Sequence, residues 1–349
     1  MLPCFKITQM KKLLLIFALL IFACSIDSEG NPCIYEPTLS TEAVTDITET
    51  SATLNGIIAI ISENCDVPNN AEQGFVYSTE IQPTLEDIQV NVNGTNISTT
   101  IEGLTPNTTY YVRSFLTNNL GDFYGNEISF TTLAIDCGLV TDIEGNIYET
   151  VVINGQCWTK SNANLITYSD GTIIPQVTDQ NQWENLTTGA WCYLMNNISN
   201  GGTYGKLYNW YAIMGIHDTD PNTANKEFAP EGWRIPFLDD WADLVSGLGG
   251  YDVAGGKLKS TTSLWAPPNT GATNESDFSA LPAGTRTTQF WEWGLGTAYW
   301  SQTEVNPPLT TNSSDAYWIY LSSNGEGVYL GPGDSFGLTP GYSIRFIKE

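Results

Sequence analysis

Histidine is almost missing from this sequence, which carries a single one, His217, in 349 residues. A Ser–His–Asp triad, or a metal centre with several histidine ligands, would therefore have to use that residue. His217 lies in the polar stretch "MGIHDTDPNTANKEF", which is typical of a surface loop. There is also no CxxC pair and no cysteine–histidine grouping of the kind that holds structural zinc. We therefore expect neither triad chemistry nor a zinc site.

Basic residues are also scarce, with 13 Lys and Arg against 38 Asp and Glu, and a formal net charge of −25. A surface of this sign repels phosphate backbones, so the composition argues against a nucleic-acid partner. Apolar residues make up 41% of the chain and aromatic residues 12%, enough for well-packed cores. The length suits two or three domains.

Long apolar runs are absent after the N-terminal segment. Lys11 and Lys12 precede an apolar run that ends at Ala23, too short to span a bilayer, and residues 1–23 are therefore predicted to be a signal peptide. The run closes with "IFAC", which resembles a bacterial lipobox and implies cleavage before Cys24 and a lipid on its thiol. A general secretory signal with an incidental cysteine is the alternative. Under the first interpretation the acyl chains on Cys24 attach the protein to a membrane.

Export to an oxidising compartment predicts disulfides among the remaining cysteines. Cys33 and Cys65 can pair within the first domain. Cys137, Cys157 and Cys192 compete for one bridge, most simply Cys137–Cys157, which leaves one thiol over.

Residues 24–37 are small and polar, as expected of a tether, and residues 38–133 show short β segments separated by turn residues. The stretch "IEGLTPNTTYYVRSFLTNNLGDFYGNEISFTT" resembles a fibronectin type III domain, an all-β sandwich. The resemblance implies that Tyr110 forms the tyrosine corner of that fold. The tryptophan usual in the second strand is absent, because "ATLNGII" stands there.

Residues 136–349 have a different composition, because all eleven tryptophans lie at or after Trp158. The opening "TDIEGNIYETVVINGQCWTKSNANL" predicts a β-meander. In "FLDDWADLVSGLGG", apolar residues recur at helical spacing, at Trp241, Leu244, Val245 and Leu248. Asp239 is expected to cap this helix, with Asp240 and Asp243 near its start. "YGKLYNWYAIMGI" is a candidate for a second helix.

The blocks "YGKLYNWYAI", "PEGWRIPFLDDWADL", "NTGATNESDFSALPAG", "AYWSQTE" and "GYSIRFIKE" follow one another in an order that resembles the Fibrobacter succinogenes major paralogous domain. This family is common in surface proteins of Bacteroidetes-type bacteria, which implies a cell-envelope location in the outer membrane or at the cell surface. The resemblance implies an α+β, C-type lectin-like fold with little regular structure over residues 136–349. It brings no assigned activity.

Two features of this domain could bind a ligand. Asp218, Asp220 and Asn222 alternate like the start of a calcium loop, although Thr223 and Ala229 replace the glycine and glutamate of an EF-hand. Calcium is therefore a possible ligand and no cofactor is required. In "QFWEWGLG", Trp291 and Trp293 would lie on one face of an extended segment, with Glu292 between them. Exposed rings there would stack on sugars, whereas buried rings would only fill the core.

Acidic residues are too numerous for spacing to single out a catalytic pair. The candidates are Asp239, Asp240, Asp243, Glu275, Asp277, Glu292 and Glu304. We expect a lipid-anchored envelope protein with a non-catalytic binding or adhesion role, directed at a glycan or another extracellular macromolecule. A carboxylate-dependent glycan hydrolase and a purely structural envelope module are the alternatives.

Overall fold

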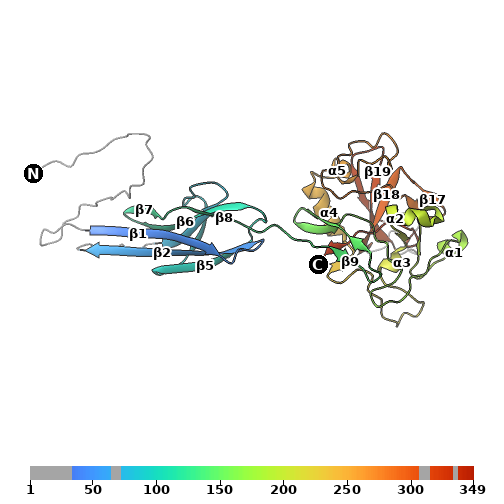
Figure 1. Cartoon of the computed structure of the whole chain (residues 1–349), viewed down its shortest axis with the longest axis horizontal. Coiled ribbons are helices and arrows are strands. Elements are labelled where there is room, and N and C mark those ends of the chain that lie inside the picture. The colour runs from blue at the N-terminus through green and yellow to red at the C-terminus, as the bar shows by residue number, and fades with distance from the viewer. Residues whose placement is uncertain (1–33, 64–71, 306–314, 333–336) are drawn as a thin grey trace, which may run out of the picture. The chain divides into compact units, whose positions relative to one another are not determined.

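The computed structural model describes residues 34–63, 72–305, 315–332 and 337–349. The chain divides between Ile135 and Asp136 into two compact units (Figure 1). The predicted signal peptide, the lipidation site Cys24 and the proposed Cys33–Cys65 bridge lie outside the described residues. Among the helices that are described, none is both long and apolar enough to cross a membrane.

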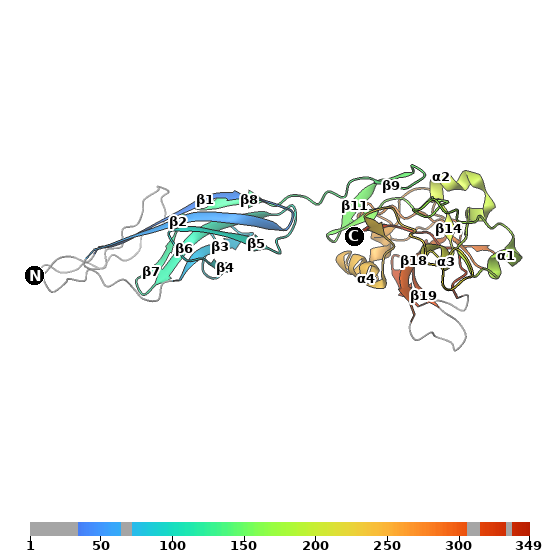
Figure 2. The same cartoon turned by 90° about the horizontal axis from the view of Figure 1, so that it is seen from below.

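The first unit is an antiparallel β-sandwich of two sheets, whose strands can be followed in Figures 1 and 2. One sheet has the order β1-β2-β5, with β1 Ile34–Thr45, β2 Ser51–Glu63 and β5 Asn96–Glu102. The other has the order β4-β3-β6-β7, and β8 pairs with β6. Its strands are β3 Glu72–Ser78, β4 Ile88–Asn91, β6 Thr109–Asn118, β7 Gly121–Tyr124 and β8 Ile128–Thr131. This distribution of consecutive strands between two sheets is fibronectin type III-like.

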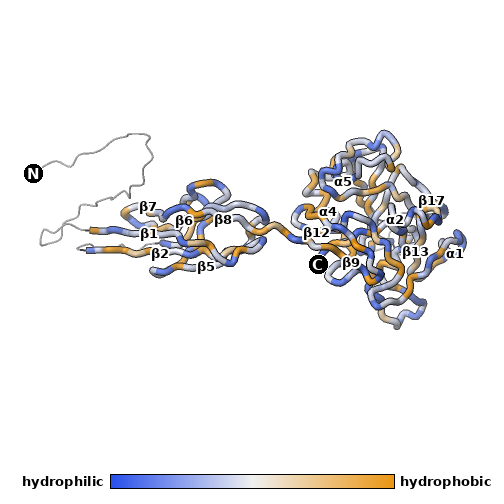
Figure 3. Tube along the Cα trace, viewed as in Figure 1, coloured by the Kyte–Doolittle hydropathy of each residue, from blue (hydrophilic) through white to orange (hydrophobic). Residues whose placement is uncertain are grey.

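The core of this unit follows from alternation along its strands. In β2, the alternate residues Ala52, Leu54, Gly56 and Ile58 are buried, while Thr53, Asn55 and Ile57 are exposed or partly covered. The apolar second half of β2 is coloured as hydrophobic in Figure 3. Phe75 from β3 and Val112 from β6 close the core from the other sheet.

The predicted tyrosine corner is confirmed. The hydroxyl oxygen of Tyr110 accepts a hydrogen bond of 3.0 Å from the backbone N–H of Thr105, five residues upstream. The Tyr110 ring is buried and stacks on Phe130, with ring centroids 5.7 Å apart. The bond therefore ties the loop between β5 and β6 to the start of β6.

The second unit contains two larger sheets and several strand pairs. The sheets have the orders β11-β12-β21-β15 and β18-β19-β20. Their strands are β11 Thr150–Ile153, β12 Gln156–Thr159, β15 Trp233–Arg234, β18 Gly296–Glu304, β19 Ala316–Ser322, β20 Val328–Gly331 and β21 Ile347–Lys348. The pairs join β9 Val140–Thr141 to β10 Ile147–Tyr148, β13 Trp191–Cys192 to β14 Leu207–Tyr208, and β16 Thr285–Arg286 to β17 Phe290–Trp291. The two turns of the predicted β-meander are present, but the meander itself is wrong, because β9–β10 and β11–β12 form two hairpins that belong to separate sheets.

The helices of this unit are short. They are α1 Gln180–Glu184, α2 Gly201–Tyr204, α3 Trp210–Ile213, α4 Leu238–Gly247 and α5 Ala254–Leu258, with 3-10 turns at Leu194–Asn196 and Ile198–Asn200. The candidate second helix in "YGKLYNWYAIMGI" is wrong as a continuous element, since it divides into strand β14 and the single turn α3. The C-type lectin-like arrangement stays a prediction.

Helix α4 is anchored by the stripe that its sequence predicts. Trp241, Leu244 and Val245 are buried, and the Trp241 ring lies 4.8 Å from that of Trp158 on β12. Leu248 is the residue just past the helix and is partly buried against the same core. An aromatic cluster thus joins α4 to the sheets around it.

The predicted cap of this helix is wrong. The helix begins at Leu238, so Asp239 lies in the first turn with an exposed side chain. Asp240 instead reaches back, and its Oδ2 accepts a 2.7 Å hydrogen bond from the Phe237 N–H. The Oγ1 of Thr303 accepts the next free N–H, that of Leu238, at 3.0 Å.

The simplest disulfide pairing is confirmed in the second unit. Cys137 and Cys157 are bonded, with their Cα atoms 5.5 Å apart, and the bridge fastens the start of the unit to β12. Cys192 is a free thiol in the core. Burial raises the pKa of this thiol to about 11 and keeps it unreactive.

Candidate functional site

The tryptophans of the second unit separate into two groups by exposure. Eight of the eleven are buried, as the core-packing interpretation expects. Trp291 and Trp293 are the exceptions, with 48% and 57% of their surface exposed, and Trp318 is half-buried. The two rings that the sequence singled out for ligand contact are therefore not used to fill the core.

Trp291 and Trp318 line a surface pocket of about 220 Å³. The walls come from segments far apart in the chain: β16 and β17, β18, β19 and the closing stretch before β21. Its lining residues, within the described ranges, are Thr285, Thr287, Trp291, Glu292, Ala298, Trp318, Tyr320 and Tyr342. Half of them carry aromatic rings, and one carries a charge. We call this site the aromatic pocket.

Strand alternation explains why β19 supplies two of these rings. Ile319 and Leu321 point into the core of the unit, so Trp318 and Tyr320 project from the opposite face. Tyr320 lies opposite Ala298 on β18 in the strand register. Because alanine is small, the sheet surface is low at this position, and the larger rings around it form the walls.

The rings hold one another in place. Tyr342 packs against the buried Trp300, with centroids 4.4 Å apart, and lies 5.8 Å from Trp318. Trp318 meets Tyr320 edge to face at 6.2 Å. Such pairs restrict ring motion, so the pocket wall is preformed.

Glu292 provides the only charge among the described residues of the lining. Its Oε2 accepts a hydrogen bond of 3.2 Å from the Tyr320 hydroxyl. Burial, together with the nearby Glu292 carboxylate, raises the pKa of Tyr320 to about 12, so the phenol remains a donor at neutral pH.

The expected extended segment through Trp291, Glu292 and Trp293 is interrupted. Glu292 has φ 59°, and its carbonyl accepts hydrogen bonds from the N–H groups of Leu295 and Gly296, each 2.8 Å long. Strand β17 therefore ends at Trp291 and the chain turns. The prediction that both rings share one face of an extended segment is wrong for this reason. Trp291 lines the pocket, whereas Trp293 is exposed outside the lining.

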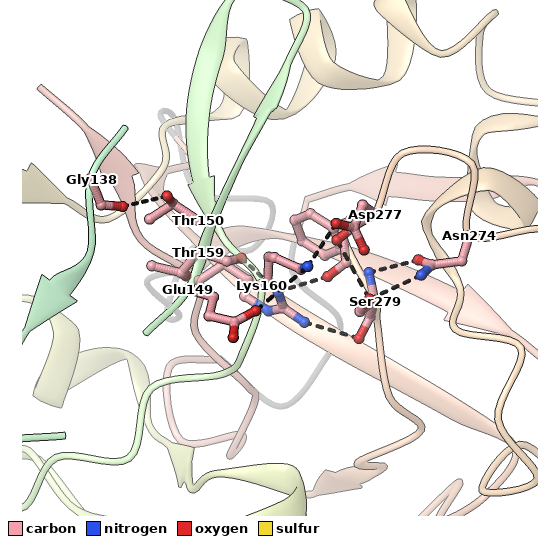
Figure 4. A network of polar contacts seen from close by, with 10 residues as sticks. Gly138, Glu149, Thr150, Thr159, Lys160, Asn274, Asp277 and Ser279 are labelled. Atoms are coloured by element: carbon pink, nitrogen blue, oxygen red, sulfur yellow. Dashed lines mark hydrogen bonds and ion pairs between the residues drawn. The ribbon is translucent and has the colours of Figure 1, made fainter. Parts of the chain in front are cut away.

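The other carboxylate candidates have structural partners or lie at the surface. Asp240 forms a bidentate ion pair with Arg234, at 2.5 and 2.8 Å. Figure 4 shows Asp277 beside Lys160, whose Nζ lies 2.6 Å from its Oδ2. Glu275 pairs with Lys257 at 3.4 Å. The side chains of Asp239, Asp243 and Glu304 are exposed, and none of these six residues lines the aromatic pocket.

The predicted calcium loop lies beside a different cavity, of about 340 Å³, which His217, Asp218 and Asp220 help to line. The carboxylates there bond to their own loop: Asp218 accepts from the Asp220 N–H at 3.0 Å, and Asp220 from the Asn222 N–H at 2.9 Å. Within the described ranges no three His, Cys, Asp or Glu side chains gather as metal ligands. Calcium binding at this loop stays a prediction.

The loop "NTGATNESDFSALPAG" is held by hydrogen bonds that stabilise the framework of the unit. Asn274 Oδ1 accepts from the Ser279 N–H at 2.8 Å, and its Nδ2 donates to Ser279 Oγ at 3.0 Å (Figure 4). The buried Arg345 donates to the backbone oxygens of Phe278 and Thr159, which joins this loop to β12 and the closing segment.

One known protein family matches most of the second unit. The model described as the Fibrobacter succinogenes major domain matches residues 151–348. A search of curated proteins found no match.

Solved structures give only partial likenesses. The sensor domain of the anti-sigma factor RsgI4 in Pseudobacteroides cellulosolvens is similar over 29% of this chain and 78% of its own, with 21% identity and a TM-score of 0.24. A shorter form of that domain matches over 28% and 96%, with 21% identity and a TM-score of 0.24. A fibronectin type III domain derived from the human KIAA0970 protein is similar over 29% and 76%, with 14% identity and a TM-score of 0.22.

Proposed function

The chain belongs to the family of the Fibrobacter succinogenes major domain, and within this domain we propose that the aromatic pocket is a non-catalytic binding site for carbohydrate. The observation that carries the proposal is the placement of the tryptophans. Eight are buried, whereas Trp291 and Trp318 gather with two tyrosines around one carboxylate at the surface. Ligand pockets commonly combine apolar rings with a few polar groups that fix orientation.

The chemistry of the lining suits a sugar. The faces of a pyranose present C–H groups that stack on flat rings such as those of Trp291 and Trp318. Glu292 and the hydroxyls of Thr285 and Thr287 can exchange hydrogen bonds with the sugar hydroxyls. The common mechanisms of glycoside hydrolysis use two carboxyl groups that flank the bond, and Glu292 is the only carboxylate among the described lining residues. Binding without cleavage is therefore the function that this pocket supports best.

A glycan array probed with the purified protein tests this proposal, with Trp291→Ala as the pocket variant. We expect Trp291→Ala to weaken binding about tenfold or more, because a central aromatic contact is removed. Trp293→Ala is the matched control, since that ring is similarly exposed but lies outside the lining. Failure of every glycan to bind, or unchanged binding by Trp291→Ala, would contradict the proposal and favour a purely structural module.

We further propose that a lipid on Cys24 holds the protein at the bacterial cell envelope and presents the pocket to extracellular material. The lipobox-like "IFAC" supports this location. Metabolic labelling with a fatty acid tests it. The protein should incorporate label, and Cys24→Ser should not. Label retained by Cys24→Ser would rule out this anchor.

A further inference from the structure

We infer that the aromatic pocket is one end of a longer surface that binds the interior of a linear, uncharged polysaccharide. This inference rests on the proposed carbohydrate-binding function and concerns the length and charge of the ligand. It starts from Tyr329 on β20, an exposed ring outside the pocket lining.

Tyr329 continues the row of rings across the sheet. The Trp318 ring lies 5.2 Å from that of Tyr329 and 5.8 Å from that of Tyr342 in the pocket. Tyr329 also lies directly opposite Tyr320 in the register of β19 and β20. The ring spacing is comparable to the length of one pyranose unit. Neighbouring rings can therefore contact neighbouring sugars of one chain.

Glycine allows these tyrosines to lie along the sheet. A Cβ at Gly331 would come within 2.6 Å of the Tyr329 hydroxyl and 2.7 Å of its ring. A Cβ at Gly296 would come within 2.4 Å of the Tyr320 hydroxyl. Each ring thus occupies space that a side chain would fill, instead of standing upright as strand side chains normally do. A ring that lies along the sheet can present its face to solvent, which is the orientation that stacks on a sugar.

Tyr329 is exposed at the edge of the described sheet. Strand β20 is the outermost strand of the β18-β19-β20 order, and 53% of the Tyr329 surface is exposed. A chain that enters the pocket beside Trp291 can therefore extend across Trp318 to Tyr329 and beyond. This geometry favours the interior of a long chain over recognition of a single terminal sugar.

Charge decides which polysaccharide fits. Among the described residues that line the pocket there is no basic side chain, and Glu292 contributes a negative charge. The whole chain has a formal net charge of −25. Uronic acid or sulfated polymers would be repelled by this field, whereas neutral polymers would not.

Calorimetric titration with neutral oligosaccharides tests the inference, using cello-, xylo- and manno-oligosaccharides from disaccharide to hexasaccharide, with oligogalacturonides as the anionic series. We expect affinity to rise with length in a neutral series. Tyr329→Ala should weaken hexasaccharide binding about tenfold and leave disaccharide binding unchanged. Gly331→Val, which displaces the Tyr329 ring, should act in the same direction, and Trp293→Ala should have no effect.

The outcomes separate the two proposals. Absence of binding by every oligosaccharide, together with a negative glycan array, overturns carbohydrate binding itself. Equal affinity for disaccharide and hexasaccharide, or hexasaccharide binding that Tyr329→Ala does not change, overturns the extended surface alone. Tighter binding of oligogalacturonides than of every neutral series overturns the assignment of an uncharged ligand.

Discussion

The Tyr320 hydroxyl donates a hydrogen bond of 3.2 Å to the Glu292 carboxylate and joins β19 to the turn that follows β17. The bond fixes the Glu292 carboxylate, the one charged group that the described part of the chain contributes to the aromatic pocket. It also explains part of the shift that raises the pKa of Tyr320 to about 12, after the larger effect of burial. Both effects disfavour the tyrosinate form.

Replacing the carboxylate should therefore change the titration of the phenol. In Glu292→Gln we expect the pKa of Tyr320 to fall from about 12 toward the ordinary value of 10.0, because the negative neighbour is gone while burial remains. Absorbance titration of tyrosinate, taken as the difference from Tyr320→Phe, measures this shift. The control is Glu304→Gln, which removes an exposed charge at the far end of β18. An equal shift in the control would assign the effect to overall charge.

The raised pKa of Tyr320 also determines whether the free energy of unfolding rises or falls at alkaline pH. The folded state holds the Tyr320 proton more tightly than the unfolded chain does, so this stabilising contribution is complete below pH 10.0. It should be lost as the pH rises toward about 12. The free energy of unfolding, measured by urea denaturation across this range, should fall less steeply in Tyr320→Phe. Identical slopes in the two proteins would contradict the assignment.

The ion pair at the start of α4 can be tested for its contribution to the stability of the fold. Asp240 accepts two hydrogen bonds from Arg234 and one from the Phe237 N–H, and its side chain is 10% exposed. Asp240→Asn should lower the free energy of unfolding by about 2 kcal/mol, because charged hydrogen bonds are lost. Asp239→Asn, one residue earlier and exposed, should change it little. Equal effects in the two variants would show that the acidic cluster acts only through the helix dipole.

The sequence could predict those parts of the fold that depend on local periodicity. Alternation in β2 and helical spacing from Trp241 to Leu248 gave the right elements, since each pattern reports one buried face. The cap of α4 could not be predicted in this way, because apolar spacing does not define the first residue of a helix. The helix starts two residues earlier than a cap at Asp239 requires, so Phe237 occupies the N-cap position and Asp240 in the first turn accepts its N–H.

The candidate site was only partly predictable. Trp291 and Glu292 stand out because they adjoin one another in a stretch rich in turn residues. Trp318, Tyr320 and Tyr342 were missed, although the alternation in "AYWIYL" could have placed Trp318 and Tyr320 on one face. Which face is buried depends on packing against distant segments, and no local pattern encodes it. The left-handed backbone at Glu292 is equally invisible in the sequence.

The bridge between Cys137 and Cys157 should stabilise the second unit. It closes a loop with a sequence separation of 20, for which the loss of unfolded-state entropy corresponds to about 3 kcal/mol. The double variant Cys137→Ser, Cys157→Ser should therefore melt at a lower temperature in calorimetry. Cys192→Ser is the control, because that thiol is free. A larger loss in the control would show that core packing outweighs the crosslink.

The hydrogen bond of the tyrosine corner should stabilise the first unit. Tyr110→Phe keeps the buried ring and its stacking on Phe130 but removes the hydroxyl that accepts from the Thr105 N–H. Because one hydrogen bond is lost, the free energy of unfolding of this unit should fall by about 1 kcal/mol. Tyr111→Phe is the matched control, since Tyr111 is the next residue and its ring lies on the other face of β6. Hydrogen exchange should show faster exchange of the Thr105 amide in Tyr110→Phe alone. Unchanged exchange of this amide in Tyr110→Phe would show that its hydrogen bond to the Tyr110 hydroxyl does not form in solution.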